Sequence, residues 1–266
     1  MIKYVILIAI IVVVCFFINP ILGVIALGLA AGYAVYTSIP AYYTTKGNRA
    51  FAAGDEEQTL KWYKKAVDTG RANVTIKTSY AYILLRTGRP EEAETVLNGV
   101  LMNRHLEKEK KYYAKQNKCM VLYKLGRMDE AVEEAEELFE VYKNSAMYGM
   151  LGYFKLLQQE DLQETLKFCL EAYDYNSDDR DIQDNLSVVY YRLGEYEKAS
   201  EISDKLVESQ PKFVEAYYHG AMIAHKCGND GKAAELLARL DECRRSYLTT
   251  VTQEEIEALK REIDKQ

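Results

Sequence analysis

A short phrase that recurs at intervals of 34 residues constrains this chain more than any other feature. Each clear copy has a basic residue, a glycine two positions later and an alanine five positions after the glycine. The clear copies are Arg86–Ala93, Lys124–Ala131, Arg192–Ala199 and Lys226–Ala233, and weaker copies lie at 54–55 and 159–161. The turn positions are therefore 54, 88, 126, 160, 194 and 228, with one interval of 38 residues among intervals of 34. Such a period is typical of a solenoid whose units stack on their neighbours.

Each copy marks the turn of one helix–turn–helix unit. A glycine after a helix adopts the left-handed cap conformation without Cβ strain, and the alanine lies where two helices approach closely. Thr59 takes the alanine position in the first unit, and Glu160 and Thr165 replace glycine and alanine in the fourth, so that turn should be looser. The longer interval adds about one helical turn, which we place around His105–Glu109.

The prolines fit the same division of the chain. Pro90 is expected in the first turn of a second helix, and Pro211 between two units. Pro40 is expected between the N-terminal segment and the repeats. None is expected in a helix interior, where proline costs about 3 kcal/mol.

The C-terminal residues predict a separate helix. Thr252-Gln253-Glu254-Glu255 matches a capping box, and an apolar stripe of Ile256, Leu259 and Ile263 follows it. Terminal repeats of a solenoid need a cap with a polar outer face. Residues 251–266 are therefore predicted to be that cap.

The N-terminal segment is apolar, and residues 4–45 contain no charged side chain. As one helix, residues 4–36 would be about 50 Å long, whereas the hydrocarbon core of a bilayer is about 30 Å thick. Asn19-Pro20 interrupts the segment, because proline disfavours helix in the residue before it. We therefore predict a transmembrane hairpin with helices at about 4–18 and 21–36. Gly28 and Gly32 have the GxxxG spacing that permits close helix contact.

The flanking charges predict the side of the membrane on which the body lies. Lys3 precedes the hairpin, Lys46 and Arg49 follow it, and the turn at 18–21 is uncharged. By the positive-inside rule both ends are expected in the cytoplasm. A single span that places the body outside is the alternative. A cleaved signal peptide is disfavoured, because the apolar stretch is about twice the usual length.

Composition argues against several classes of function. Residues after Lys3 carry 33 Lys and Arg against 40 Asp and Glu, so there is no general attraction to nucleic acid. The five cysteines contain no CxxC pair, and the three histidines are dispersed, so we expect no cofactor and no metal site. Walker, GxSxG and GxGxxG motifs are absent, so we expect neither an enzyme nor a small-molecule substrate. The acids of 133–140 are expected to be the solvated face of a helix, and those of 174–179 turn and helix-capping residues.

These repeats resemble those of the tetratricopeptide repeat (TPR) family over about residues 41–245. The resemblance is most specific in the fifth unit, from Leu186 through Tyr190, Gly194 and Ala199 to Pro211. No unit has the early tryptophan of the family. The apolar segment predicts a membrane anchor at 1–39. The resemblance adds a TPR α-solenoid of about six units at 40–250, followed by the capping helix, so the whole chain is expected to be all-α.

The resemblance also implies that the first helix of each unit lines a concave groove that binds a protein or peptide. Mapped by position, the groove candidates are Thr44, Asn48, Tyr82, Arg86, Met120, Tyr123, Lys124, Phe154, Tyr191, Arg192, Tyr218 and Lys226. The carboxylate clamp of one TPR subfamily is not expected here, because Thr44 and Ser79 stand at two of its positions.

The predicted function is a scaffold or adaptor that is held in the lipid bilayer through residues 4–36. The array is expected on the cytoplasmic side of a bacterial plasma membrane, where it recruits a peptide segment or a partner protein. The alternative is an outward-facing envelope or secretion assembly subunit with a single-span anchor.

Overall fold

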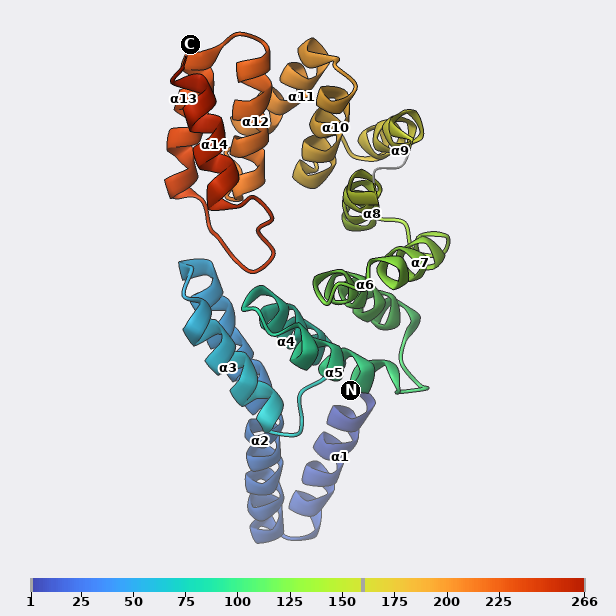
Figure 1. The fold of residues 1–266 in the computed structure, drawn as a ribbon. Helices are drawn as coiled ribbons and strands as arrows, with labels where there is room; N and C mark the ends of the chain where they lie inside the picture. Colours follow the sequence, from blue (N-terminus) through green and yellow to red (C-terminus); the bar gives the residue numbers. More distant parts are fainter. Residues whose placement is uncertain (1, 159–160, 266) are drawn as a thin grey trace. The chain divides into compact units, whose positions relative to one another are not determined.

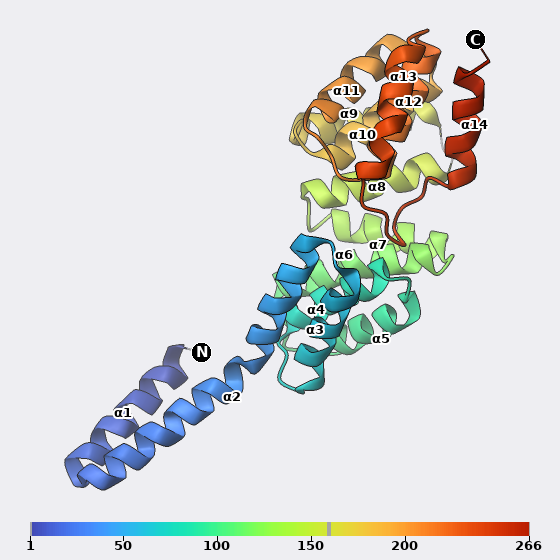
Figure 2. The same ribbon diagram turned by 90° about the vertical axis from the view of Figure 1, so that its left-hand side faces the viewer.

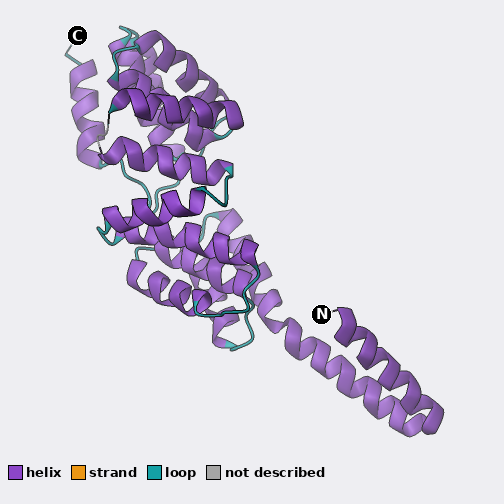
Figure 3. Cartoon of the chain, turned by 90° about the vertical axis from the view of Figure 1, so that its right-hand side faces the viewer, coloured by secondary structure: helices purple, strands orange, loops and turns teal. Residues whose placement is uncertain are grey.

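The computed structural model describes residues 2–158 and 161–265, and every regular element in this part of the chain is helical (Figure 3). The chain divides into two compact units: residues 1–80 form unit 1 and residues 81–266 form unit 2. The boundary between them falls inside a helix. The predicted all-α class is confirmed for the described residues.

Unit 1 begins with two antiparallel helices, α1 (Ile2–Ile18) and α2 (Pro20–Ala53), which lie side by side in Figure 2. Asn19 ends the first helix and caps the second, because its Oδ1 accepts a hydrogen bond from the Ile21 N–H at 2.8 Å. Gly23 is the close-contact glycine of this hairpin, where it faces the ring of Phe16. The contact predicted at Gly28 and Gly32 is wrong, since no neighbouring atom lies within 4 Å of a Cβ added at either position.

Helix α2 continues far beyond the predicted end at residue 36, and Pro40 lies inside it. The expectation that Pro40 separates two elements is therefore wrong. Two threonine hydroxyls near the proline bond helix carbonyls: Thr37 Oγ1 donates to Tyr33 O at 3.0 Å, and Thr44 Oγ1 donates to Pro40 O at 2.8 Å. Pro40 is buried in α2, which packs on α3. The apolar segment and the first repeat thus share one helix of 34 residues.

The second half of α2 packs against α3 (Glu56–Asp68) as the first helix–turn–helix unit. Gly54 lies between them with φ of 81°, and Asp55 caps α3 by accepting from the Gln58 N–H at 2.9 Å. Thr59 is buried, as expected of a residue in the alanine position.

The remaining helices repeat this arrangement, and α4 crosses the boundary between the units. They are α4 (Val74–Arg86), α5 (Pro90–Leu101), α6 (Lys108–Lys124), α7 (Met128–Phe139), α8 (Ser145–Gln158), α9 (Leu162–Tyr175), α10 (Arg180–Arg192), α11 (Tyr196–Glu208), α12 (Val214–Lys226) and α13 (Asp230–Ala238). The long interval is taken up in part by α6, which has 17 residues where α10 and α12 have 13.

The turn glycines behave as the sequence pattern predicts. Gly88, Gly126, Gly194 and Gly228 all have φ between 75° and 78°, in the left-handed region that favours glycine. The turn at Glu160 lies outside the described residues. Thr165 is fully buried in α9, at the position where other units have alanine.

A short 3₁₀ helix, η1 (Arg239–Glu242), follows α13, and α14 (Gln253–Ile263) ends the chain. The capping box is confirmed, because Thr252 Oγ1 accepts from the Glu255 N–H while the Glu255 carboxylate accepts from the Thr252 N–H. Ile256 and Leu259 are buried against α12 and α13. The predicted cap helix thus closes the last apolar face.

Candidate protein-binding surface

The first helices of the repeats form one side of unit 2. Figure 1 shows α6, α8, α10 and α12 along this inner side and α7, α9 and α11 along the outer side. Neighbouring inner helices contact each other directly, as between α8 and α10 and between α10 and α12. Stacking of this kind makes an extended concave surface. The inner side of unit 2 is therefore the candidate binding surface.

A loop from the C-terminal part of the chain lies on this inner side, and we call residues 243–252 the inner loop. Its Tyr247 N–H donates to Arg86 O, at the end of α4, at 3.0 Å. Lys124 Nζ, at the end of α6, donates to Leu248 O at 3.4 Å and lies 5.3 Å from the centre of the Tyr247 ring. The loop thus contacts helices that precede it by more than 120 residues.

The two ends of the inner loop are held by α12 and the residues before it. The Thr250 N–H and hydroxyl both donate to Glu215 Oε1, at 2.6 and 3.2 Å. The Arg244 N–H donates to Lys212 O at 2.9 Å. Three of these bonds use the loop backbone as donor, so this surface holds a stretch of irregular polypeptide largely through its main chain. Figure 1 shows the loop extending beyond the ends of α12 and α14.

Polar side chains from three inner helices meet beneath the loop. The Tyr123 and Tyr153 hydroxyls are 2.9 Å apart. Burial and the bond to Tyr123 raise the pKa of Tyr153 far above its usual range. Burial lowers the pKa of Lys124, and the charge of Glu215 partly offsets this effect. Lys124 and Glu215 are thus opposite charges that both bind the inner loop.

Acidic residues of α10 and α12 line the next part of the surface. His219 Nδ1 lies 2.9 Å from Asp184 Oδ1. Burial lowers the pKa of His219, but the charge and hydrogen bond of Asp184 outweigh it and the net change is upward. Asp181 reaches solvent but packs against Gly149 of α8. Partial desolvation where its side chain lies against α8, followed by the charges of Asp179, Asp184 and Glu215, raises its pKa from 3.8 to about 6.

The raised pKa of Asp181 predicts a pH-dependent stability. A carboxyl whose pKa is higher in the folded state favours folding at low pH, and this contribution is lost as pH rises through about 6. We expect Asp181→Asn to be more stable than the unaltered chain at pH 7.5, with the difference shrinking toward pH 4. Urea unfolding of the full chain in detergent at both pH values measures this. Asp174→Asn is the control, because Asp174 is exposed on α9 and is not among the charges that raise the pKa of Asp181. Equal stabilities of Asp181→Asn and the unaltered chain at both pH values would contradict the assignment.

The structure corrects one groove candidate and reassigns others. Phe154 is fully buried in the core, so its predicted place on the binding surface is wrong. Arg192 is exposed, and its guanidinium donates to Leu156 O at 2.6 Å, one of the last carbonyls of α8. This bond supports the helix end that lacks a turn glycine. Tyr218 is partly buried and packs against the apolar cluster that also contains Ile256 and Leu259 of α14.

The other candidates keep partial or full exposure. Within unit 2, Tyr82, Met120 and Tyr191 are half-buried and Lys226 is exposed. Thr44 and Asn48 belong to unit 1, where Asn48 Oδ1 accepts from the Tyr63 hydroxyl at 2.6 Å. Glu215, Tyr247 and Thr250 were not among the sequence-based candidates. Nothing in their spacing signals a contact with α4 or α6.

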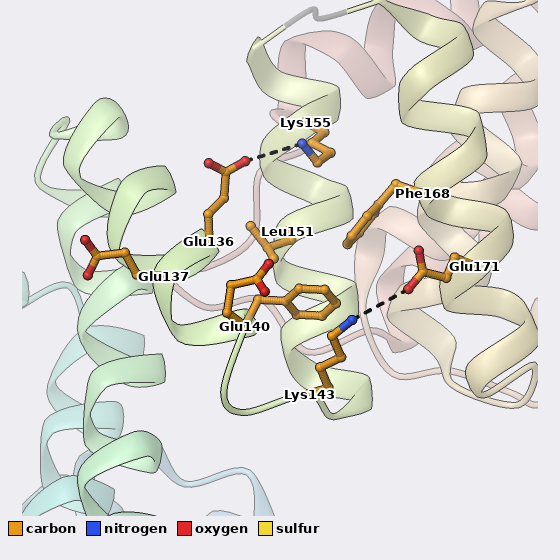
Figure 4. A pocket seen from close by; sticks show the side chains of 9 residues that line it. Glu136, Glu137, Glu140, Lys143, Leu151, Lys155, Phe168 and Glu171 are labelled. Carbon is orange, nitrogen blue, oxygen red and sulfur yellow. Dashed lines mark ion pairs between the residues drawn. The ribbon is translucent and has the colours of Figure 1, made fainter.

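A hollow of about 570 Å³ lies away from the inner surface, among α7, α8 and α9 (Figure 4). Phe139, Leu151 and Phe168 form its apolar part. In Figure 4 two lysines cross it as ion pairs, Lys155 with Glu136 at 3.5 Å and Lys143 with Glu171 at 4.0 Å. The acids of α7 lie on the solvated side of a helix whose other face is buried, as the sequence predicts.

Within residues 2–158 and 161–265 no three metal-binding side chains gather to hold an ion. Residues 174–179 act as expected of turn and helix-capping residues: Asn176 Oδ1 accepts from the Asp178 N–H at 3.2 Å, and Asp179 caps α10. Burial raises the pKa of the Cys119 and Cys169 thiols to about 12, which makes them poor nucleophiles.

The fold and its inner surface define an α-solenoid of helix–turn–helix repeats, a class that is typically a noncatalytic scaffold for protein interactions. Residues 156–222 match the family model for the tetratricopeptide repeat. No curated protein matches the sequence significantly. The family match covers about a quarter of the chain, and solved structures of tetratricopeptide repeat proteins share its fold.

Solved structures of three bacterial proteins share the fold. PilF of Pseudomonas aeruginosa is 16% identical, with a TM-score of 0.58 over 85% of this chain and 99% of that protein. A thermophilic TPR protein of Thermus thermophilus is 17% identical, with a TM-score of 0.56 over 73% and 100% of the two chains. A TPR protein of Parabacteroides merdae is 15% identical, with a TM-score of 0.55 over 85% and 86%.

Proposed function

We propose that this protein is a membrane-anchored TPR scaffold that binds an extended segment of a partner protein on the inner surface of unit 2. In this proposal residues 1–39 anchor the chain, residues 40–250 form the array, and residues 251–266 cap it. The bilayer is a bacterial plasma membrane, and the array faces the cytoplasm.

The exposed apolar surface of α1 and α2 supports the anchor. Helix α2 is long and apolar enough to cross a bilayer, and Ile6–Ile18 is a shorter apolar helix. Large apolar side chains along both helices, such as Phe17 at 88% and Leu29 at 71%, are exposed in the chain alone. A contiguous apolar surface of this kind needs a lipid or protein environment. In the hairpin proposal both α1 and α2 cross the bilayer. In the single-span alternative α2 alone crosses it.

The inner loop is the observation that carries the binding proposal. The inner surface binds the backbone of this irregular segment at three points. Arg86 O and the Glu215 carboxylate accept hydrogen bonds from its N–H groups, and the Lys124 ammonium donates to one of its carbonyls. Backbone recognition of this type is independent of the sequence of the bound segment. A partner segment that replaces the inner loop finds the same donors and acceptors.

Crosslinking in native membranes tests this proposal. A photoreactive residue at Met120, on α6, is expected to capture a discrete partner, and capture should increase when the inner loop is replaced by a Gly/Ser linker. The same residue at Glu137, which is exposed on the outer helix α7, is the matched control. Capture from the outer position alone, unchanged by the loop replacement, would contradict binding on the inner surface.

The side of the membrane is tested separately. A C-terminal reporter that is active only in the periplasm should be inactive, and one that is active only in the cytoplasm should be active. The reverse result would favour the alternative, an outward-facing envelope or secretion assembly subunit with a single span.

A further inference from the structure

The junction between the apolar helix and the first repeat carries a cluster of aromatic and cationic side chains. Helix α3 runs antiparallel to α2, so the residues after it return to the end of the apolar segment. There the Arg71 guanidinium lies 3.6 Å from the centre of the Tyr36 ring. Tyr36 is the last residue of the apolar helix that the sequence predicts at 21–36. Arg71 therefore lies at the level where hydrocarbon gives way to polar surroundings.

A second layer of the cluster surrounds Trp62, the single tryptophan of the chain. The ammonium groups of Lys46 and Lys65 lie 4.8 and 4.7 Å from the centre of its ring. The Tyr43 ring stacks on it at 5.8 Å. We call Tyr36, Tyr43, Lys46, Trp62, Lys65 and Arg71 the collar.

The collar cations are not neutralised within the described residues, where no carboxylate forms an ion pair with Lys46, Lys65 or Arg71. The Arg71 Nε is buried and makes no hydrogen bond there. By contrast, Lys64, which precedes Lys65 on α3, forms an ion pair with Asp68 at 2.9 Å. The collar thus presents positive charge with unused donors beside the apolar segment.

The net charge of the chain is also positive in the unit that carries the collar and negative in the other unit. Residues 1–80 carry eight Lys and Arg against four Asp and Glu, a net charge of +4. Residues 81–266 carry 26 against 36, a net charge of −10. An anionic surface attracts the first unit and repels the second. Tryptophan and tyrosine also favour the headgroup level of a bilayer, and arginine binds phosphate through a planar fork of donors.

We propose that the collar binds the phosphates of anionic lipids in the leaflet next to the repeats, with Arg71 and Lys65 as the main contacts. The inference rests on the membrane anchoring of the proposed function. It adds a lipid-binding site on the first repeat, which no part of the apolar segment supplies. The continuous helix α2 joins this site directly to the anchor.

Trp62 allows the inference to be tested in the full chain without an added probe on the protein. The chain is reconstituted in phosphatidylcholine vesicles that contain a trace of either phosphatidylglycerol or phosphatidylcholine with a nitroxide close to the headgroup. Quenching of Trp62 by the two labelled lipids is compared as a ratio. We expect the anionic lipid to quench about twofold more or better, because juxtamembrane cations attract anionic headgroups.

The variant Arg71→Gln/Lys65→Gln should bring the ratio to about one, whereas Lys64→Gln, which also removes one positive charge from α3, should keep it. Equal quenching by both lipids in the unaltered chain, with the chain still inserted, would overturn the collar site alone. Release of the chain from the vesicles by alkaline carbonate would instead overturn the membrane anchor. Loss of the ratio in Lys64→Gln as well would show general charge attraction and would also overturn the site.

Discussion

Replacing residues 244–250 with a Gly/Ser linker of equal length should make the chain bind a free peptide of residues 243–252 at least about tenfold more tightly than the unaltered chain does. The inner loop is an intramolecular competitor for the same donors and acceptors. The linker keeps the backbone N–H and C=O groups, but it lacks the Tyr247 ring beside Lys124 and the Thr250 hydroxyl on Glu215, and its glycines lose more conformational freedom on binding. Differences of about 0.5–1 kcal/mol each then add up to a factor of ten or more in affinity. Helix α14 stays in place in this variant, because Ile256 and Leu259 hold it against α12 and α13.

Fluorescence anisotropy of a labelled peptide measures this binding in detergent. A peptide with alanine in place of Tyr247 is expected to bind more weakly, because it loses the contact with Lys124. The chain variant Glu215→Gln should also weaken binding, since a charged acceptor of the Thr250 N–H becomes neutral. Equal peptide affinity with and without the native loop would show that the loop does not occupy a binding surface.

The substitution Gly47→Ala should destabilise unit 1 by about 1–3 kcal/mol, the usual cost of overpacking a close contact. Gly47 is buried where α2 meets α3. A Cβ there would lie 2.7 Å from Cδ2 and 2.9 Å from Cε2 of the buried Tyr63 ring. The ring cannot move freely, because its hydroxyl donates to Asn48 Oδ1 at 2.6 Å. Urea unfolding followed by Trp62 fluorescence reports this unit directly.

Gly99→Ala is the matched control for Gly47→Ala. Gly99 lies in α5, and no atom lies within 4 Å of an added Cβ there. This substitution should raise stability by about 0.5–1 kcal/mol, because alanine favours helix over glycine. If both alanines acted in the same direction, the close approach of α2 and α3 at Gly47 would not exist in solution.

Local chemistry made much of the fold predictable. A left-handed glycine such as Gly126, a capping box at Thr252, and a proline such as Pro90 at the start of α5 each act within a few residues, so the sequence alone indicates them. Pro40 misled for a related reason. Its local effect is to break a helix, but α2 packs on α3 and stays continuous through the buried proline.

The candidate surface was less predictable, because it depends on contacts between distant residues. Assignment to the first helix of a repeat places Phe154 on the correct element, but helical position alone does not distinguish its buried side from its exposed side. The contacts of Tyr247 with Arg86 and of Thr250 with Glu215 join segments far apart in the chain. No periodic pattern in residues 243–252 indicates them.

The most direct test of the account is to locate the bound peptide. A peptide of residues 243–252 with a photoreactive group in place of the Tyr247 side chain is crosslinked to the loop-replaced chain in membranes, and mass spectrometry maps the attachment. The account predicts attachment at the ends of α4 and α6, near Arg86 and Lys124. Attachment confined to the outer helices α7 and α9, near Glu137, would contradict it.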